Sequence, residues 1–167
     1  MSTTKATVVL LVDTRNFVCL ARKKQAIHHE GEAISYSLGL WNGYGGKMEV
    51  SDESIESTAI RELFDESGVL GKKEDLVAKG SVLFLLSKEN KEEPFMEVTF
   101  YFLHKWVGSP KETFEMGEPT FFQEDALPYQ GMMPADKVIF ETMFQGKKLA
   151  GEVVLFGKET APAFRLD

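Results

Sequence analysis

The sequence of 167 residues has little cysteine and no long apolar run. Its single cysteine, Cys19, lies in the apolar segment FVCLA, so no disulfide can form within the chain and an inert, buried thiol is expected. A chain that needs no disulfide suits a reducing, cytoplasmic setting. The apolar stretch near the start ends at Asp13, is too short to span a bilayer and lacks the features of a secretory signal, so no membrane association is expected.

Basic residues are fewer than acidic ones, with 19 Lys and Arg against 26 Asp and Glu, so the formal net charge is −7. Nucleic-acid backbones are held mainly by Lys and Arg that neutralise phosphates, so a nucleic-acid polymer is not an expected partner. A phosphate bound by this chain is expected to arrive with a metal cation. The length fits one compact domain over residues 1–167, which we expect to be a monomer, and such a domain buries about 68–70% of the surface that its unfolded chain exposes.

The first half of the chain predicts two strands and a loop. Residues 7–13 and 17–21 are rich in Val and Leu and are separated by the turn-like sequence DTRN, so we expect them to pair as a hairpin in the core. Residues 23–37 (KKQAIHHEGEAISYS) are polar and contain a glycine. This composition predicts a flexible surface loop without regular structure, which could border a pocket.

The second half predicts another hairpin, a helix and two short strands. Residues 81–87 and 95–107 are strongly β-prone and are joined by the charged, proline-containing turn KENKEEP. A helix is expected between Pro134 and Gly146. The other expected elements are a loop at 108–119, a short strand at 120–123 and a last strand at 152–157. Hairpins combined with two separated helices predict an α+β fold or an α/β/α sandwich.

The other predicted helix runs from Glu53 to Ser67, a segment without glycine or proline. Ser51 or Asp52 is the expected N-cap, and Gly68 is expected to end the helix. Residues at i, i+4 spacing share one face of a helix. The expected inward stripe consists of Ile55, Ala59 and Leu63.

Three carboxylates, Glu62, Asp65 and Glu66, share one patch of this helix because their spacing makes them surface neighbours. They repel one another and face the negative end of the helix dipole, and both effects favour a bound cation. A solvated acidic face is the alternative interpretation. The glycine-rich WNGYGGK just upstream can bring backbone carbonyls and amides close to the patch. Oxygen ligands of this kind suit Mg²⁺ or Mn²⁺ rather than zinc.

This segment resembles the signature of the Nudix hydrolase family, G-x5-E-x7-R-E-U-x-E-E-x-G-U, in which U is aliphatic. The match covers about residues 46–69, with Asp65 where the signature has Glu and with one extra residue between Gly46 and Glu53. The many fixed positions make the match specific. The matching residues are Glu53, Arg61, Glu62, Leu63, Asp65, Glu66, Gly68 and Val69.

The resemblance implies an α/β/α sandwich with a mixed β-sheet and a hydrolase that uses Mg²⁺ or, alternatively, Mn²⁺. Its catalytic residues would be Glu62 and Glu66, which would also be the main metal ligands. Asp65, which is shorter and can act through a water, the Gly46 carbonyl, and a loop acid, Glu115 or less favourably Glu118, would complete the metal shell. Arg61 is expected to form a structural ion pair, with Glu53 as a candidate partner, rather than to act in catalysis.

The segments LWNGYGGK, ARKK and FFQEDALPYQGMMPADKVIF resemble the MutT-homologue branch of this family, which hydrolyses oxidised purine nucleoside triphosphates. The resemblance implies that Asn42 and Asp136 read the purine edge. Phe84 and Met96 could equally be plain core residues, and Asn42 could cap a turn. Ala135 stands where this branch has a second acid. The implied pocket walls are Lys23, Phe84, Met96 and Met133.

The expected function is therefore Mg²⁺-dependent hydrolysis of a nucleoside triphosphate such as 8-oxo-dGTP to the monophosphate and pyrophosphate. Two alternatives remain open from the sequence. One is the same chemistry on a nucleotide sugar, a dinucleoside polyphosphate or capped RNA. The other is a Nudix domain that binds nucleotides without turnover.

Overall fold

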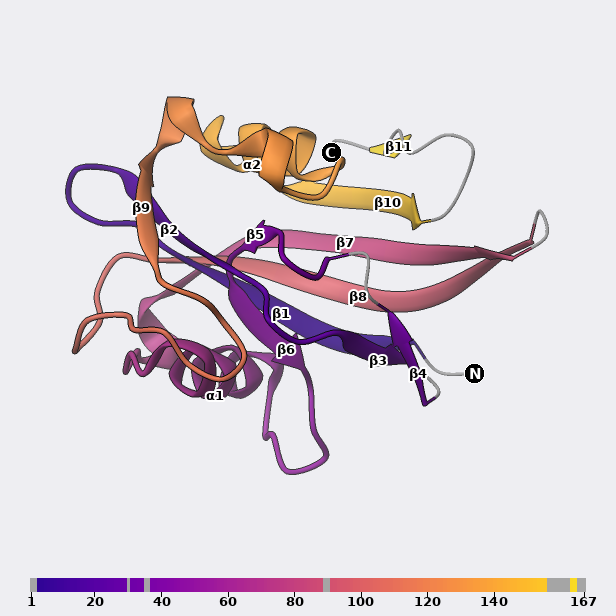
Figure 1. The fold of residues 1–167 in the computed structure, drawn as a ribbon, viewed down its shortest axis with the longest axis horizontal. Coiled ribbons are helices and arrows are strands. Elements are labelled where there is room, and N and C mark those ends of the chain that lie inside the picture. Colours follow the sequence, from indigo (N-terminus) through magenta and orange to yellow (C-terminus); the bar gives the residue numbers. More distant parts are fainter. Residues whose placement is uncertain (1–2, 30, 35–36, 89–90, 156–162, 165–167) are drawn as a thin grey trace.

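The computed structural model describes residues 3–29, 31–34, 37–88, 91–155 and 163–164. Its two helices lie on opposite faces of a central β-sheet (Figure 1). The strands are β1 (Thr4–Leu11), β2 (Phe17–Arg22), β3 (Ile27–His29), β4 (Glu32–Ile34), β5 (Trp41–Asn42), β6 (Tyr44–Lys47), β7 (Leu76–Lys88), β8 (Lys91–Leu103), β9 (Thr120–Gln123), β10 (Leu149–Leu155) and β11 (Ala163–Phe164). The helices are α1 (Ile55–Ser67) and α2 (Asp136–Phe144), with short 3₁₀ turns at Lys73–Asp75, Glu124–Ala126 and Tyr129–Gly131.

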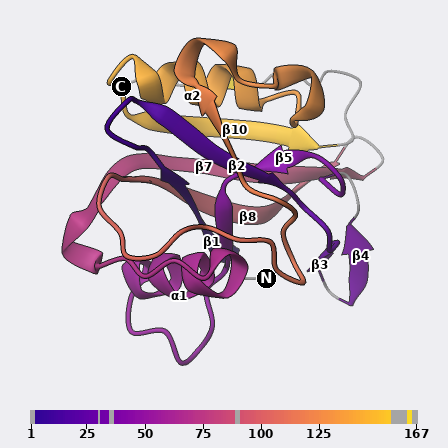
Figure 2. The same cartoon turned by 60° about the vertical axis from the view of Figure 1, so that its left-hand side comes forward.

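The central sheet has six strands in the order β11-β10-β7-β8-β1-β6. Strands β1 and β8 are parallel, as are β7 and β10, whereas the other neighbouring pairs are antiparallel. The sheet is therefore mixed, and the view in Figure 2 shows it between α1 and α2. This arrangement confirms the predicted α/β/α sandwich. The assignment of the whole chain to one domain stays a prediction.

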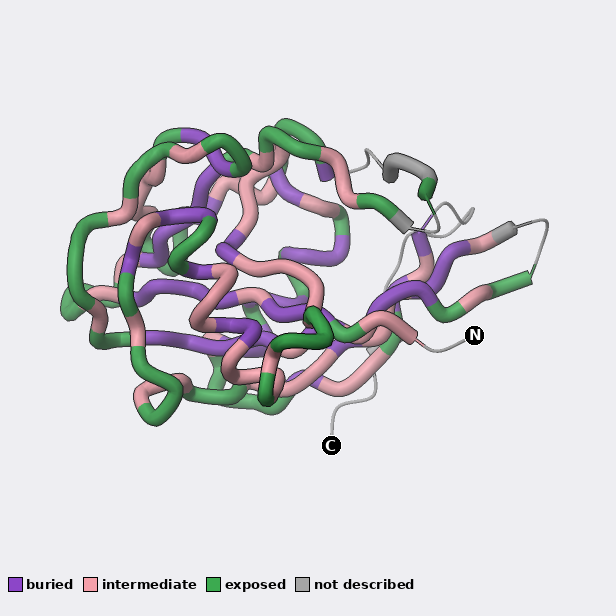
Figure 3. The backbone as a smooth tube through the Cα atoms, turned by 90° about the horizontal axis from the view of Figure 1, so that it is seen from below, coloured by how far each residue is buried: buried purple, intermediate pink, exposed green. Residues whose placement is uncertain are grey.

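Strand β1 contributes to two separate cores because its side chains alternate between the two faces of the sheet. Leu10 and Val12 belong to the hydrophobic cluster that contains Phe140 of α2. Val9 and Leu11 belong to the cluster that contains Leu63 of α1. Figure 3 shows the buried stretches running through the strands, with exposed segments at the periphery.

The expected pairing of the first two strands is wrong. Strand β1 pairs with β6 and β8, so both of its edges are occupied within the central sheet. Strand β2 pairs with β5 and β9 in a separate three-stranded sheet. An isolated bridge between Val12 and Val18 and a hydrogen bond of 3.0 Å from the Asp13 amide to the Phe17 carbonyl join the ends of the two segments.

The expectation of an irregular loop at 23–37 is also wrong, because β3 and β4 form a small antiparallel hairpin there. Gly31, with φ of 81°, has the left-handed conformation that tight hairpin turns require. The predicted role of this segment at a pocket is confirmed, since Lys23, Ile27 and Ser37 line a cavity.

Most of the other expected elements are confirmed, with shifted bounds. Strands β7 and β8 form the second hairpin; β7 is longer than predicted, whereas β8 begins and ends four residues earlier than predicted. Strand β10 begins at Leu149 and contains residues 152–155 of the expected last strand, whose residues 156–157 lie outside the described residues; β11 follows it. Cys19 is buried as expected, and burial raises the pKa of its thiol to about 11. Among the described residues, no helix combines the length and apolar character needed to cross a bilayer.

Helix α1 begins later than expected. Its N-cap is Ser54, whose Oγ accepts a hydrogen bond of 3.1 Å from the Ser57 amide, instead of Ser51 or Asp52. The predicted end is confirmed, since Gly68 has φ of 77° and its amide donates to the Phe64 carbonyl. The inward stripe is confirmed in its last two members, because Ala59 and Leu63 are fully buried while Ile55 is partly buried.

Candidate active site

A groove lies between α1 and β6, on the face of the sheet that α1 covers. The predicted carboxylates Glu62, Asp65 and Glu66 all line it, together with Gly45 and Gly46 of β6. Glu115 reaches the same groove from the loop that precedes β9, whereas Glu118 is not among the lining residues. The structure therefore brings together every residue that the sequence analysis predicted for the metal site.

Glu66 is the most deeply placed of these acids, with 2% of its surface exposed. Its Oε1 accepts a hydrogen bond of 2.7 Å from the Gly45 amide. Burial, with smaller contributions from the charges of Glu62 and Glu115, raises the pKa of Glu66 to about 8, although Lys23 and the hydrogen bond from the Gly45 amide act to lower it. A second positive charge in the groove would favour the ionised form.

Two glycines let β6 approach these acids. A Cβ at Gly45 would clash with the Thr7 backbone on β1, and one at Gly46 would lie within 2.6 Å of Glu62 Oε1. The glycine-rich segment is thus needed for close packing of strand against strand and of strand against carboxylate. It leaves the backbone of Gly46 lining the same groove as Glu62.

Arg61 is structural, as predicted, but its expected partner is wrong. Its Nε and Nη2 donate to Asp52 Oδ1 and Oδ2, each at 2.9 Å, and its Nη1 donates to Glu62 Oε1 at 2.8 Å. Glu53 instead has a side chain that is 86% exposed and lies 3.9 Å from Lys73. The bidentate Arg61 pair holds the pKa of Asp52 well below its usual range.

This pairing also relocates the extra residue of the signature. Asp52 follows Gly46 after five intervening residues, the spacing that the signature gives its first acid. The additional residue therefore lies between Asp52 and Arg61, where the Ser54 cap begins the helix. The turn before it is closed by the Glu49 amide, which donates to Asp52 Oδ2 at 2.9 Å. The backbone between Gly46 and Asp52 consequently needs no bulge.

The groove suits a hard divalent cation by its donor chemistry, since its acids offer oxygen ligands only. Among the described residues, no group of three or more Asp, Glu, His or Cys side chains is already arranged closely enough to hold a metal ion. Glu62 is turned toward Arg61, and Glu66 toward the Gly45 amide, while Asp65 is about half exposed. Burial raises the pKa of Glu62, as it does that of Glu66. Repulsion among like charges keeps such carboxylates apart until a cation is bound.

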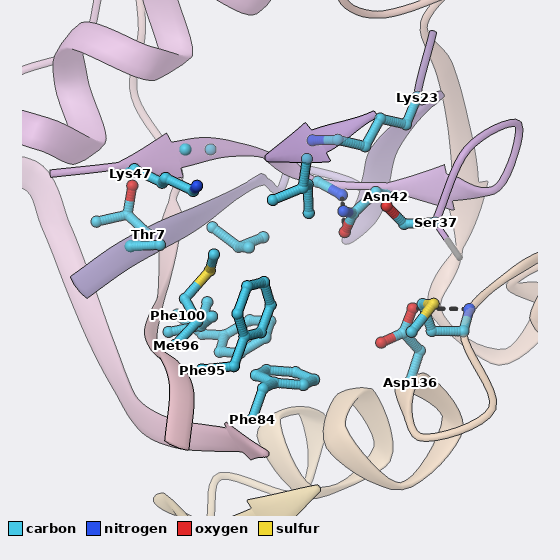
Figure 4. A pocket seen from close by; sticks show the side chains of 18 residues that line it. Thr7, Lys23, Ser37, Asn42, Lys47, Phe84, Phe95, Met96, Phe100 and Asp136 are labelled. Atoms are coloured by element: carbon cyan, nitrogen blue, oxygen red, sulfur yellow. Dashed lines mark hydrogen bonds between the residues drawn. The ribbon is translucent and has the colours of Figure 1, made fainter. Parts of the chain in front are cut away.

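A second cavity adjoins the groove and shares Lys23, Ile27, Gly45, Gly46 and Lys47 with it (Figure 4). All the residues predicted to bind substrate line this cavity. They are Lys23, Asn42, Phe84, Met96, Met133 and Asp136.

The walls of the cavity are apolar, and its polar groups are few. Phe84 on β7 and Met96 on β8 are paired in the sheet and pack in the same hydrophobic cluster, so they are both core and wall. Asn42 Oδ1 accepts from the Gly43 amide at 3.0 Å, which leaves the amide NH₂ available to the cavity.

Asp136 lies at the start of α2 and is buried. Its Oδ2 accepts a hydrogen bond of 3.2 Å from the Met133 amide. Burial raises the pKa of Asp136 to about 7. The carboxyl group can therefore donate or accept a hydrogen bond near neutral pH.

Sequence reasoning missed several residues of this cavity. Thr7 also lines it, Ser37 contributes a hydroxyl group, and Lys47 contributes an amine whose pKa is lowered by burial. Strand alternation groups the Thr7 side chain with Val9 and Leu11, on the face of β1 that α1 covers, so it could not have marked Thr7 as a pocket residue. No local pattern marks Ser37. Phe95 and Phe100 complete the apolar lining.

Comparisons with known proteins agree with this geometry. The family model described as NUDIX domain matches residues 2–143. The oxidized purine nucleoside triphosphate hydrolase of Mus musculus is 31% identical over 166 residues, covering 99% of this chain and 96% of that protein. The protein of the same name from Danio rerio is 30% identical over 167 residues, covering 100% of this chain and 97% of the relative.

Solved structures show the same fold. The crystal structure of a mutator MutT protein from Bacillus halodurans superposes with a TM-score of 0.76 and 24% sequence identity, covering 98% of this chain and 97% of the other. The family model spans most of the sequence, and the two relatives are matched along nearly their whole length. The chain therefore belongs to the Nudix family of hydrolases.

Proposed function

We propose that this protein hydrolyses oxidised purine nucleoside triphosphates, such as 8-oxo-dGTP, to the monophosphate and pyrophosphate with Mg²⁺ or Mn²⁺. The observation that carries the proposal is the junction of the two cavities, where an apolar pocket with few polar groups opens into a carboxylate groove. A base in the pocket would place its phosphates in the groove. The names of the Mus musculus and Danio rerio relatives support this substrate class.

The pocket residues would orient the nucleoside. Phe84 and Met96 would pack against the faces of the base, because aromatic and thioether side chains stack well on planar rings. Asn42 would donate from its free NH₂ to the base edge, and Asp136 would offer a carboxyl group that is near its pKa at neutral pH. These contacts would hold the α–β phosphoanhydride bond over the groove.

The groove residues would then act on the phosphates. Lys23 and Lys47 line both cavities and would neutralise phosphate charge where the pocket meets the groove. Glu62, Glu66, Asp65, Glu115 and the Gly46 carbonyl would hold the cation, which supplies charge neutralisation and a lowered pKa for a bound water. Glu62, whose pKa is raised by burial, would accept the proton of the attacking water, while Arg61 fixes its orientation. The water oxygen bonds to phosphorus as the bond to the bridging oxygen breaks.

The test is product analysis of the purified protein over a panel of normal and oxidised purine triphosphates, nucleotide sugars, dinucleoside polyphosphates and capped RNA, with and without Mg²⁺. We expect release of monophosphate and pyrophosphate from 8-oxo-dGTP faster than from dGTP. Equal rates for the two would overturn the preference for an oxidised base. Turnover of another class alone would assign that class, and binding without turnover would make the chain a nucleotide-binding domain.

The proposal includes the setting of the reaction. We take the protein to act as a monomer in the cytoplasm, removing damaged purine nucleotides before they reach DNA synthesis. Size-exclusion chromatography with light scattering measures the monomer directly.

A further inference from the structure

Two buried hydroxyl groups, Thr7 Oγ1 and Ser37 Oγ, have no hydrogen-bond partner among the described residues, and Ser37 lines the cavity next to the groove. Ser37 is 4% exposed. Buried polar groups in folded proteins are nearly always paired, so an unpaired one calls for an explanation. Ser37 lines the cavity, so a ligand in that cavity is the natural partner of its hydroxyl.

The backbone around Ser37 is firmly held, in contrast to its side chain. The Ser37 carbonyl accepts a hydrogen bond of 3.1 Å from the Leu40 amide, which closes a turn. This turn is fixed to the end of β2, because the Gly39 amide donates to the Lys23 carbonyl and the Lys23 amide donates to the Leu40 carbonyl. Arg22 Nη1 also donates to the Gly39 carbonyl at 3.0 Å. The backbone that carries the Ser37 side chain is therefore positioned before any ligand is bound.

The turn places Ser37 close to the residues that would read the base. It leads directly into β5, which carries Asn42, and Figure 4 shows Ser37 near Asn42, with Asp136 farther along the cavity. The free group of Asn42 can only donate, whereas a serine hydroxyl can donate and accept. Ser37 thus adds to this wall a hydroxyl group that can both donate and accept.

We propose that Ser37 is a specificity-determining residue that hydrogen-bonds through Oγ to the edge of the purine base, beside Asn42. This inference rests on the proposed function and extends it to a residue that the family signature does not contain. The segment that supplies Ser37 comes after the β3–β4 hairpin, so this hairpin region helps to build the base pocket.

The test compares Ser37→Ala with Ser81→Ala. Ser81 is a matched control because it is also partly buried, but its Oγ pairs with Thr99 Oγ1 at 3.0 Å between β7 and β8. The ligand is an α,β-imido analogue of the triphosphate that the wild type hydrolyses fastest, and calorimetry measures its Kd. We expect Ser37→Ala to raise Kd and KM about fivefold to tenfold with little change in kcat, as for the loss of one hydrogen bond.

Thermal unfolding without ligand separates a binding role from a structural one. Ser37→Ala removes an unpaired hydroxyl, so its Tm should be unchanged or higher than that of the wild type. Ser81→Ala breaks a hydrogen bond within the protein, so its Tm should fall while its Kd is unchanged. A lower Tm for Ser37→Ala with an unchanged Kd would overturn the proposal in favour of a purely structural serine.

A base-free deoxyribose triphosphate distinguishes the base from the rest of the nucleotide. We expect the wild type and Ser37→Ala to bind this probe equally. An equal loss of affinity for this probe and for the full nucleotide would place the contact on the sugar or phosphates and overturn the base assignment. If the wild type hydrolyses a purine triphosphate and Ser37→Ala has the same Kd and KM as the wild type, the base contact of Ser37 is excluded while the proposed function stands. If the wild type hydrolyses none, the proposed function falls, and the Ser37 assignment falls with it.

Discussion

The groove and the pocket differ in how their polar groups are satisfied. In the groove, Arg61 bonds to Asp52 and Glu62, and Glu66 accepts from the Gly45 amide. In the pocket, Ser37 Oγ has no partner among the described residues. The protein itself therefore orders the groups that would act on phosphates, whereas it leaves hydrogen-bonding capacity in the pocket for a ligand.

The largest expected effect is on the groove. Glu66→Gln keeps an oxygen that can accept from the Gly45 amide but removes the charge that would hold a cation. We expect kcat/KM with Mg²⁺ to fall by on the order of a hundredfold or more, because changes even beyond the direct ligands of a metal cost 10–100-fold. Steady-state kinetics and circular dichroism measure activity and folding. Full activity in the folded variant would remove the proposed metal site.

A second prediction tests whether the ion pair between Arg61 and Asp52 stabilises the groove. Asp52→Ala leaves Arg61 without its bidentate partner, and we expect the free energy of unfolding to fall by about 2–3 kcal/mol, as for a broken, largely buried ion pair. Urea unfolding measures this change. The control is Glu53→Ala, whose exposed side chain should contribute less than about 0.5 kcal/mol. Similar losses in both variants would contradict the assignment of Asp52 as the partner.

A smaller, pH-dependent effect tests the pocket. Burial raises the pKa of Asp136 to about 7, above the value of about 3.9 for an unfolded aspartate. The folded state then binds more protons than the unfolded state between these values, so this carboxyl lowers stability as pH rises from about 4 to about 7, by at most about 1.4 kcal/mol per pH unit. Asp136→Asn should remove this dependence, and its advantage over the wild type should level off above pH 7.

The corresponding measurement is urea unfolding of both proteins at a series of pH values in the absence of nucleotide. Asp136→Asn still offers an oxygen to the Met133 amide, so the comparison isolates the charge. Parallel stability curves for the two proteins would mean that Asp136 ionises normally in the folded state.

Helix α1 and its acids could be predicted because the information is local. Helical spacing alone groups Glu62, Asp65 and Glu66, and Gly68 marks the end of the helix through its own conformation. The resemblance then supplied the pocket residues, and Asn42 and Asp136 do line one cavity. Each of these predictions depended on residues close in sequence or on a motif with fixed spacing.

Two of the wrong predictions concern which segment pairs with a strand and which acid pairs with an arginine. The segments of β1 and β2 look like a hairpin, but β6 and β8 occupy both edges of β1. The family signature suggested Glu53 as the partner of Arg61, but in the structure the partner is Asp52. The helix begins after both acids, at the Ser54 cap, so helical spacing does not decide between them. Which of two adjacent acids meets Arg61 depends on the path of the turn, and the sequence does not specify that path.

Ser37 could not have been found from the sequence at all. Its role as a lining residue depends on a turn that is fixed to the end of β2 by hydrogen bonds between backbone groups. Backbone groups are the same in every residue, so they leave no signal in composition or periodicity. The unpaired state of its hydroxyl becomes visible only when the surrounding side chains are placed.

The alternation of β1 has a consequence for mutational tolerance. Val8 lines the pocket, and the backbone of its neighbour Thr7 is in close contact with Gly45, which lines the groove, so one strand is shared by both sites. A slip of one residue in the pairing of β1 would exchange its two faces and spoil both sites together. A single insertion or deletion within Thr4–Leu11 should therefore abolish both base binding and hydrolysis. In laboratory evolution for a changed base preference, we expect the accepted substitutions to lie outside this strand.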